Sequence, residues 1–132
     1  MRPELLGEIR AIYGALATHD LAALRSLTLV DPEFSWQSAS DEPETGVRHG
    51  AARALAFSGE LLETFDRMQI EIEQEVELGN DAAIFVVHMR VRGTASGADT
   101  ARREAHLWTA RGGRLTGLRE FPTVELAMAA AE

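Results

Sequence analysis

The segment that decides the fold reads QIEIEQEVELGNDAAIFVVHMRVR and occupies residues 69–92. Its first part alternates, and this pattern predicts a half-exposed antiparallel strand. The apolar face of that strand carries Ile70, Ile72, Val76 and Leu78, and the other face, expected to be solvated, carries Glu71, Glu73, Glu75 and Glu77. Gly79-Asn80-Asp81 has the composition of a turn. Residues 82–92 then predict a second strand, which is apolar on both faces through its first half.

The elements around this pair of strands follow from the same kind of pattern. Downstream, two strands joined by Gly112-Gly113 predict a hairpin, because two glycines are a strong two-residue turn signal. Upstream, helical spacing of apolar residues predicts two helices, a strand and a longer helix. The expected ranges are helix 4–18, a short helix capped by Asp20, strand 33–37, loop 38–49, helix 50–68, strands 102–111 and 114–122, and helix 123–131. The order predicts a single α+β domain over residues 1–132.

Composition limits the classes of function. The formal net charge of −8 argues against nucleic-acid binding and against binding to an anionic membrane surface. The absence of cysteine excludes disulfides and thiolate chemistry, and the four histidines lack a metal-ligand spacing. We therefore expect no metal and no cofactor. With no secretory signal or membrane-spanning stretch recognised, we expect a cytoplasmic location.

Four short pieces of sequence resemble the SnoaL-like and ketosteroid isomerase-like proteins of the nuclear transport factor 2-like superfamily. They are Ile12–Leu16 followed by His19-Asp20-Leu21, then Asp31–Trp36, Arg48-His49-Gly50, and Ala105–Thr109 with Gly112-Gly113-Arg114. The resemblance covers nearly the whole chain. It implies a cone-shaped fold in which a curved antiparallel sheet wraps around the long helix, with a pocket for a small molecule between them.

The resemblance also allows a test of steroid-isomerase chemistry, which needs a carboxylate base with a tyrosine and a protonated carboxyl group as donors. Tyr13 falls at the position of the tyrosine donor. The base position falls at Trp36 or Gln37, and the protonated carboxyl position falls at Ala105. Two of the three groups are absent, so this particular mechanism is not expected.

Alternation along residues 82–92 supplies another candidate. The resemblance places Ile84, Val86, His88 and Arg90 inside the pocket. His88 is then the candidate acid or base, because imidazole titrates near neutrality, and Arg90 is a candidate ligand for an anionic oxygen. The competing interpretation is that His88 is an ordinary polar residue of the sheet and that Arg90 is solvated.

Further pocket residues are expected on the other elements. The family register turns Glu120 inward, where it would partner His88 or Arg90; an exposed carboxylate on an edge strand is the competing interpretation. Trp36, Phe57 and Phe65 would give aromatic walls suited to a flat apolar ligand, or would be plain core.

Two functions stay open on this basis. The first is an enzyme that acts on a small apolar or aromatic metabolite by proton transfer, as an isomerase, cyclase or hydrolase, with Tyr13 and His88 as its catalytic groups. The second is a ligand-binding or accessory module with the same pocket and no turnover. A carboxylate paired with a histidine in one cavity would favour the enzyme.

The opposite face of residues 82–92 is also apolar. If Ala105 and Leu107 face the pocket, the outer face of the sheet is an exposed apolar patch, which predicts a homodimer through that face. The patch consists of Phe85, Val87, Met89, Val91, His106 and Trp108. The alternative is that residues 124–131 fold back over it within one chain.

Overall fold

The computed structural model describes residues 1–39 and 46–132. Its elements follow the order α1 (Pro3–Ala17), α2 (Leu21–Arg25), β1 (Val30–Gln37), β2 (Val47–His49), α3 (Ala51–Thr64), β3 (Phe65–Glu77), β4 (Ala82–Gly93), β5 (Asp99–Arg111), β6 (Arg114–Phe121) and α4 (Val124–Ala131). The expected α+β architecture is confirmed. The strands form one six-stranded sheet in the order β2-β1-β6-β5-β4-β3.

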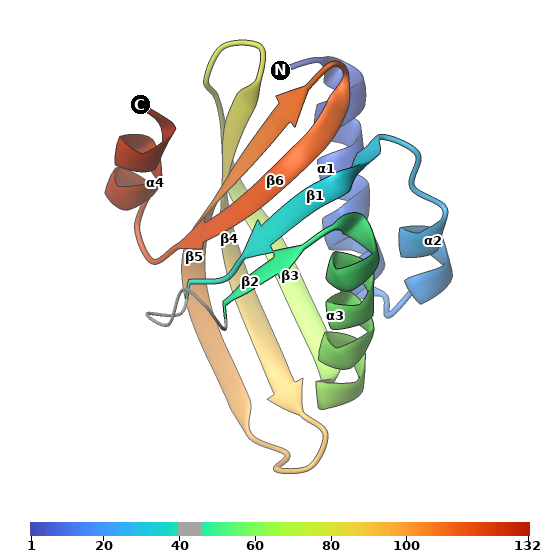
Figure 1. The fold of residues 1–132 in the computed structure, drawn as a ribbon. Helices are drawn as coiled ribbons and strands as arrows, with labels where there is room; N and C mark the ends of the chain where they lie inside the picture. Colours follow the sequence, from blue (N-terminus) through green and yellow to red (C-terminus); the bar gives the residue numbers. More distant parts are fainter. Residues whose placement is uncertain (40–45) are drawn as a thin grey trace.

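The curved sheet has a layer of helices on each side (Figure 1). Helices α1, α2 and α3 lie against the concave, inner face, and the C-terminal helix α4 packs on the outer face of β4 and β5. The helices form where the sequence predicts them because their apolar residues recur at helical spacing. In α1, for example, Leu5, Ile9, Tyr13 and Leu16 are all buried.

Local signals set several element boundaries. The Asp20 carboxylate accepts a hydrogen bond from the Ala23 amide and so caps α2, as predicted. Gly112 and Gly113 both have positive φ angles, 62° and 76°, which a tight β5–β6 hairpin requires and glycine adopts without strain. The Thr123 hydroxyl accepts from the Leu126 amide and caps α4.

Three expectations about the elements need correction. The long helix ends at Thr64 and the chain continues directly into β3, so residues 65–68 are strand. Part of the predicted loop 38–49 lies outside the described residues, and its end forms the short strand β2. The sheet is mixed, since β1 pairs with β6 in parallel and every other pairing is antiparallel.

A register shift in β3 changes which residues share a face. Pairing moves by one residue between Ile72 and Gln74, which is a β-bulge. Ile70 and Ile72 therefore pack on the helix side of the sheet, and Val76 and Leu78 pack with α4 on the other side. The four glutamates divide in the same way and do not form one solvated face. Glu75 pairs with Arg10 of α1, whereas Glu73 pairs with Arg103 on the outer face.

Candidate active site

A cavity of about 510 Å³ lies between the three N-terminal helices and the inner face of the sheet. Its size is that of a site for a drug-sized organic molecule. Most of its wall is apolar. Helices α1 and α2 contribute Leu16 and Leu24, α3 contributes Leu55 and Leu61, β3 contributes Met68 and Ile70, and β4 contributes Met89 and Val91. Such a wall favours a ligand with a largely apolar body.

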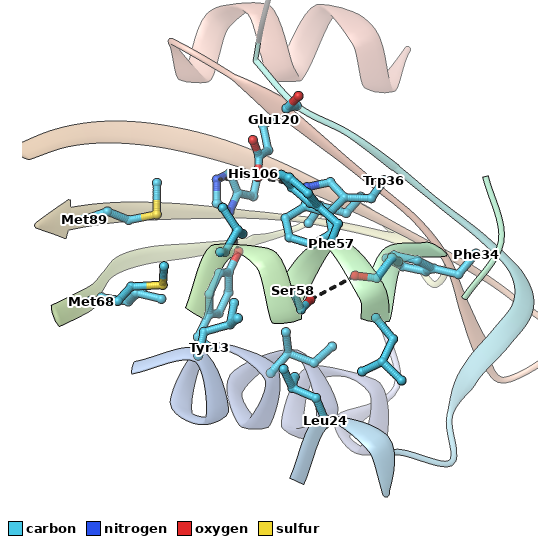
Figure 2. A pocket seen from close by; sticks show the side chains of 18 of the residues that line it. Tyr13, Leu24, Phe34, Trp36, Phe57, Ser58, Met68, Met89, His106 and Glu120 are labelled. Atoms are coloured by element: carbon cyan, nitrogen blue, oxygen red, sulfur yellow. Dashed lines mark hydrogen bonds and ion pairs between the residues drawn. The ribbon is translucent and has the colours of Figure 1, made fainter. Parts of the chain in front are cut away.

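Polar groups gather in one part of this cavity. Figure 2 shows Glu120, His106 and Trp36 together on one side, whereas Leu24 lies on the opposite side. Tyr13 reaches this group from α1, and Phe57 lies next to Trp36 with ring centroids 4.9 Å apart. A ligand in the cavity would therefore meet apolar walls along most of its surface and ionisable groups at one place.

A chain of hydrogen bonds fixes the Tyr13 hydroxyl group. Trp108 Nε1 is 2.9 Å from Tyr13 Oη, and an indole N–H can only donate, so the tyrosine oxygen accepts this bond. Tyr13 Oη is also 2.6 Å from His106 Nδ1. Burial raises the pKa of the Tyr13 hydroxyl well above its usual range, against the hydrogen bond from Trp108, which lowers it. The phenol therefore stays protonated, and its O–H group donates a hydrogen bond to His106 Nδ1.

The second nitrogen of His106 faces a carboxylate. His106 Nε2 is 2.9 Å from Glu104 Oε1, and both side chains are buried. Arg102 Nε lies 3.0 Å from the other oxygen of Glu104 and neutralises part of its charge. In the neutral ring, Nδ1 accepts from Tyr13 and the single ring proton is on Nε2, where it is donated to Glu104.

Glu120 completes the cluster from the neighbouring strand. Its Oε2 accepts a hydrogen bond of 3.0 Å from Trp36 Nε1 and lies 3.9 Å from His106 Nε2. Burial raises the pKa of the Glu120 carboxyl group, and nearby Glu104 adds to the rise; His106 and the Trp36 hydrogen bond work in the opposite direction. A buried carboxyl group with a raised pKa is a common feature of catalytic acids and bases.

Glu104, His106 and Glu120 also place three potential ligand atoms within 4.8 Å of one another, a grouping that could hold a metal ion. The same three side chains also have protein partners outside the group, in Tyr13, Trp36 and Arg102. Throughout residues 1–39 and 46–132, every buried side-chain nitrogen or oxygen has a hydrogen-bond partner.

The structure brings together five of the nine residues that the sequence analysis proposed for the pocket. The five that line the cavity are Tyr13, Trp36, Phe57, Phe65 and Glu120. The placement of Ile84, Val86, His88 and Arg90 is wrong. Ile84 and Val86 pack in the cluster under α4, His88 is half-buried on the outer face of the sheet, and Arg90 is exposed. The inward residues of β4 are instead Phe85, Val87, Met89 and Val91.

The predicted dimer patch needs the same correction. Its six residues, Phe85, Val87, Met89, Val91, His106 and Trp108, do share a face, but that face is the inner one. Trp108 is 1% exposed and Phe85 is fully buried within the chain, so neither is available to a second copy. The outer apolar cluster is formed by Ile84, Val86, Ala105 and Leu107, and α4 covers it through Ala127. Residues 124–131 do fold back on the sheet, but they cover this outer cluster and not the six residues over which the alternative placed them.

One extra residue in β6 separates the register of a regular hairpin from the observed one. At the hairpin, Ala110 pairs with Leu115, but Thr109 pairs with Gly117, so Thr116 is inserted between two regular pairs. Without this bulge Glu120 would lie opposite Ala105; with it, Glu120 lies opposite His106. Glu120 was correctly turned inward, but the strand beside it was turned the wrong way.

Sequence reasoning therefore did not identify Glu104, and it assigned His106 to the outer face instead of the site. A signal for them was present. Along residues 102–108, one face of the strand carries Arg102, Glu104, His106 and Trp108, and the other face carries Arg103, Ala105 and Leu107. A row of polar residues that ends in a tryptophan is unusual for a solvated face. The glycine turn alone could not decide which of the two faces was buried.

Helices over the inner face of a curved, mixed sheet, with a cavity between them, define the class of fold. Residues 9–118 match the family model for the SnoaL-like domain, and the chain belongs to that family. No curated protein sequence matches it.

Similar solved structures share the fold at low sequence identity. A nuclear transport factor 2-like protein of unknown function from Burkholderia pseudomallei is 18% identical, with 94% of each chain covered and a TM-score of 0.73. TerC, crystallised with polyporic acid, is 19% identical, with 95% of each chain covered and a TM-score of 0.72. A Mycobacterium tuberculosis protein in complex with estradiol-17β-hemisuccinate is 13% identical, with 91% of this chain and 94% of that chain covered and a TM-score of 0.75.

Within the described part of the chain, no helix is long and apolar enough to cross a membrane.

Proposed function

We propose that this protein binds a small apolar or aromatic metabolite in its cavity and transfers a proton on it, with Glu120 as the group that takes up and returns the proton. The observation that carries the proposal is a buried carboxyl group, 3.9 Å from a histidine, in a largely apolar cavity. The complexes of similar folds with polyporic acid and with estradiol-17β-hemisuccinate support a small organic ligand.

The hydrogen bonds favour Glu120 over the other ionisable groups of the cavity. The Tyr13 hydroxyl group donates a hydrogen bond to His106. Both ring nitrogens of His106 are hydrogen-bonded, one to Tyr13 and the other to Glu104. Among the described residues, Glu120 accepts one hydrogen bond, from Trp36 to its Oε2. His88, the base expected from the sequence, does not line the cavity.

Burial suits Glu120 to this chemistry. A carboxylate that has lost its water shell holds a proton more tightly, and an acid or base works best when its pKa is near the working pH. In the simplest reaction of this kind, Glu120 takes a proton from a carbon next to a carbonyl group. The C–H electron pair forms an enolate, and the proton returns from Glu120 to another atom of the ligand, so nothing is oxidised or reduced.

Deuterium exchange tests the proposal without knowledge of the natural substrate. Cyclic and polycyclic ketones are incubated with the protein in D₂O, and incorporation at carbons next to the carbonyl is followed by mass spectrometry. We expect Glu120→Gln to slow the exchange by roughly 10²–10⁴-fold, the usual contribution of a positioned acid or base. Glu125→Gln is the matched control, because Glu125 is exposed on α4. Equal rates for the wild type and Glu120→Gln would contradict the proposal.

A non-catalytic binding module is the second candidate. The continuous apolar wall and the full satisfaction of buried polar atoms within the described residues favour it. Tight binding of ketones with no exchange above the rate in buffer would identify the protein as a binder.

A further inference from the structure

Glu104 is a buried carboxylate to which the proposed reaction gives no direct part. Its side chain is 3% exposed, whereas that of the preceding Arg102 on the same face of β5 is 64% exposed. Burying a carboxylate is costly unless each oxygen finds a partner. Here Oε1 accepts from His106 Nε2 at 2.9 Å and Oε2 pairs with Arg102 Nε at 3.0 Å.

His106 lies between two carboxylates and makes a hydrogen bond with one of them. Its Nε2 is 2.9 Å from Glu104 but 3.9 Å from Glu120, which is beyond hydrogen-bond range. Tyr13 occupies the other ring nitrogen and prevents the ring from turning over without losing that bond. The ring proton is therefore directed at Glu104.

We propose that Glu104 is a positioning residue: it holds the Nε2 proton of His106 away from Glu120 and so leaves Glu120 free to exchange a proton with the bound molecule. This inference rests on the proposed function of Glu120. Within residues 1–39 and 46–132, the titratable and charged groups in contact with the pair are Tyr13 of α1, Arg102 of β5 and Glu120 of β6.

Removal of Glu104 changes the partner of the histidine. Without its acceptor, the ring tilts toward the remaining carboxylate, and a direct hydrogen bond from His106 stabilises ionised Glu120. The loss of the neighbouring negative charge also lowers the pKa of Glu120, because Glu104 contributes to the raised pKa of Glu120. A more stable carboxylate is a weaker base.

Nuclear magnetic resonance of the ligand-free protein tests this arrangement. The nitrogen shifts of His106 report which ring nitrogen carries the proton, and the carboxyl carbon shift of Glu120 reports its titration midpoint. In the wild type we expect the proton on Nε2. Glu104→Leu should lower the Glu120 midpoint, and Glu104→Gln, which keeps an oxygen acceptor for Nε2, should preserve the His106 tautomer and lower the midpoint less.

The control is Glu73→Gln, which removes a carboxylate paired with Arg103 on the opposite face of the sheet and should change neither reading. A His106 proton on Nδ1 in the wild type, or a Glu120 midpoint unchanged in both Glu104 variants, would overturn the proposal. If Glu104→Leu does not fold, Glu104→Gln alone decides it through the midpoint.

Ketone exchange adds a functional reading. Glu104→Leu should slow it by about 10- to 100-fold, the usual effect of losing the outer partner that orients a functional histidine. The magnetic resonance readings need no substrate. Failure of the exchange assay with the expected tautomer and midpoints would therefore count against the proposed function and not against the role of Glu104.

Discussion

His106 and Glu120 lie directly opposite each other on β5 and β6, and His106 Nε2 is 3.9 Å from Glu120 Oε2. In a regular hairpin closed by Gly112-Gly113, Glu120 would pair with Ala105. The extra residue Thr116 in β6 shifts the pairing by one residue, so that Glu120 pairs with His106. The bulge therefore has a chemical consequence: it places a carboxylate opposite the histidine in the cavity, where a regular hairpin would place Ala105.

Stability should depend on the ionisation of Glu120. Its folded-state pKa lies above that of an unfolded glutamate, about 4.3. The native state is thus favoured while Glu120 is protonated, and this stability is lost as the pH rises from the unfolded pKa through the folded pKa. Glu120→Gln removes the cost, so we expect a higher melting temperature than wild type at pH 7.

The same comparison at pH 4 supplies the internal control, because the carboxyl group is then largely protonated in both states and the difference should nearly vanish. Thermal unfolding followed by circular dichroism at the two pH values measures it. A variant that is less stable than wild type at pH 7 would show that ionised Glu120 is stabilised by its partners.

The Tyr13 hydroxyl group should matter for stability more than for contact with a ligand. Tyr13→Phe keeps the ring but leaves the Trp108 N–H and His106 Nδ1 without their partner. An unsatisfied buried polar group costs about 1–3 kcal/mol. Chemical denaturation should show a loss of this size relative to the wild type.

The space in the cavity can be tested apart from its chemistry. Ala54 lines the cavity on α3, and Ala56 on the same helix is exposed. Ala54→Leu should weaken binding of the neutral fluorescent probe N-phenyl-1-naphthylamine by filling its space, and Ala56→Leu should leave binding unchanged. Overpacking costs typically 1–3 kcal/mol of stability, so folding is checked by circular dichroism. Equal probe affinity in both variants would place the probe elsewhere.

Much of the fold could be predicted from the sequence because its signals are local. The spacing of Leu5, Ile9 and Leu16, the cap at Asp20 and the turn at Gly112-Gly113 each act over a few residues, and the structure confirms them. The resemblance to the family also gave the inward direction of Glu120, which lines the cavity.

The rest depended on non-local packing. Two β-bulges, at Ile72/Gln74 and at Thr109/Ala110, each reverse the face of every later residue, and neither leaves a clear trace in composition. In β4, residues 83–87 are buried on both faces, by the N-terminal helices and by α4. A strand buried on both faces carries no alternation that could reveal which side holds the cavity.

The two histidines of the central strands provide the sharpest contrast for a final prediction. His88 on β4 is half-buried on the outer face, and His106 on β5 is buried with hydrogen bonds at both ring nitrogens. His88→Ala should therefore change stability by no more than about 0.5 kcal/mol, as is usual for a substitution away from the core. It should also leave probe binding and ketone exchange at wild-type levels. His106→Ala removes the partner of Tyr13 and of Glu104, and we expect a loss of about 1–3 kcal/mol together with slower exchange. Denaturation curves and the exchange assay on both variants measure these effects. A His88→Ala protein that folds but has lost ketone exchange would mean that the outer face of the sheet, and not the cavity around Glu120, is where the chemistry occurs.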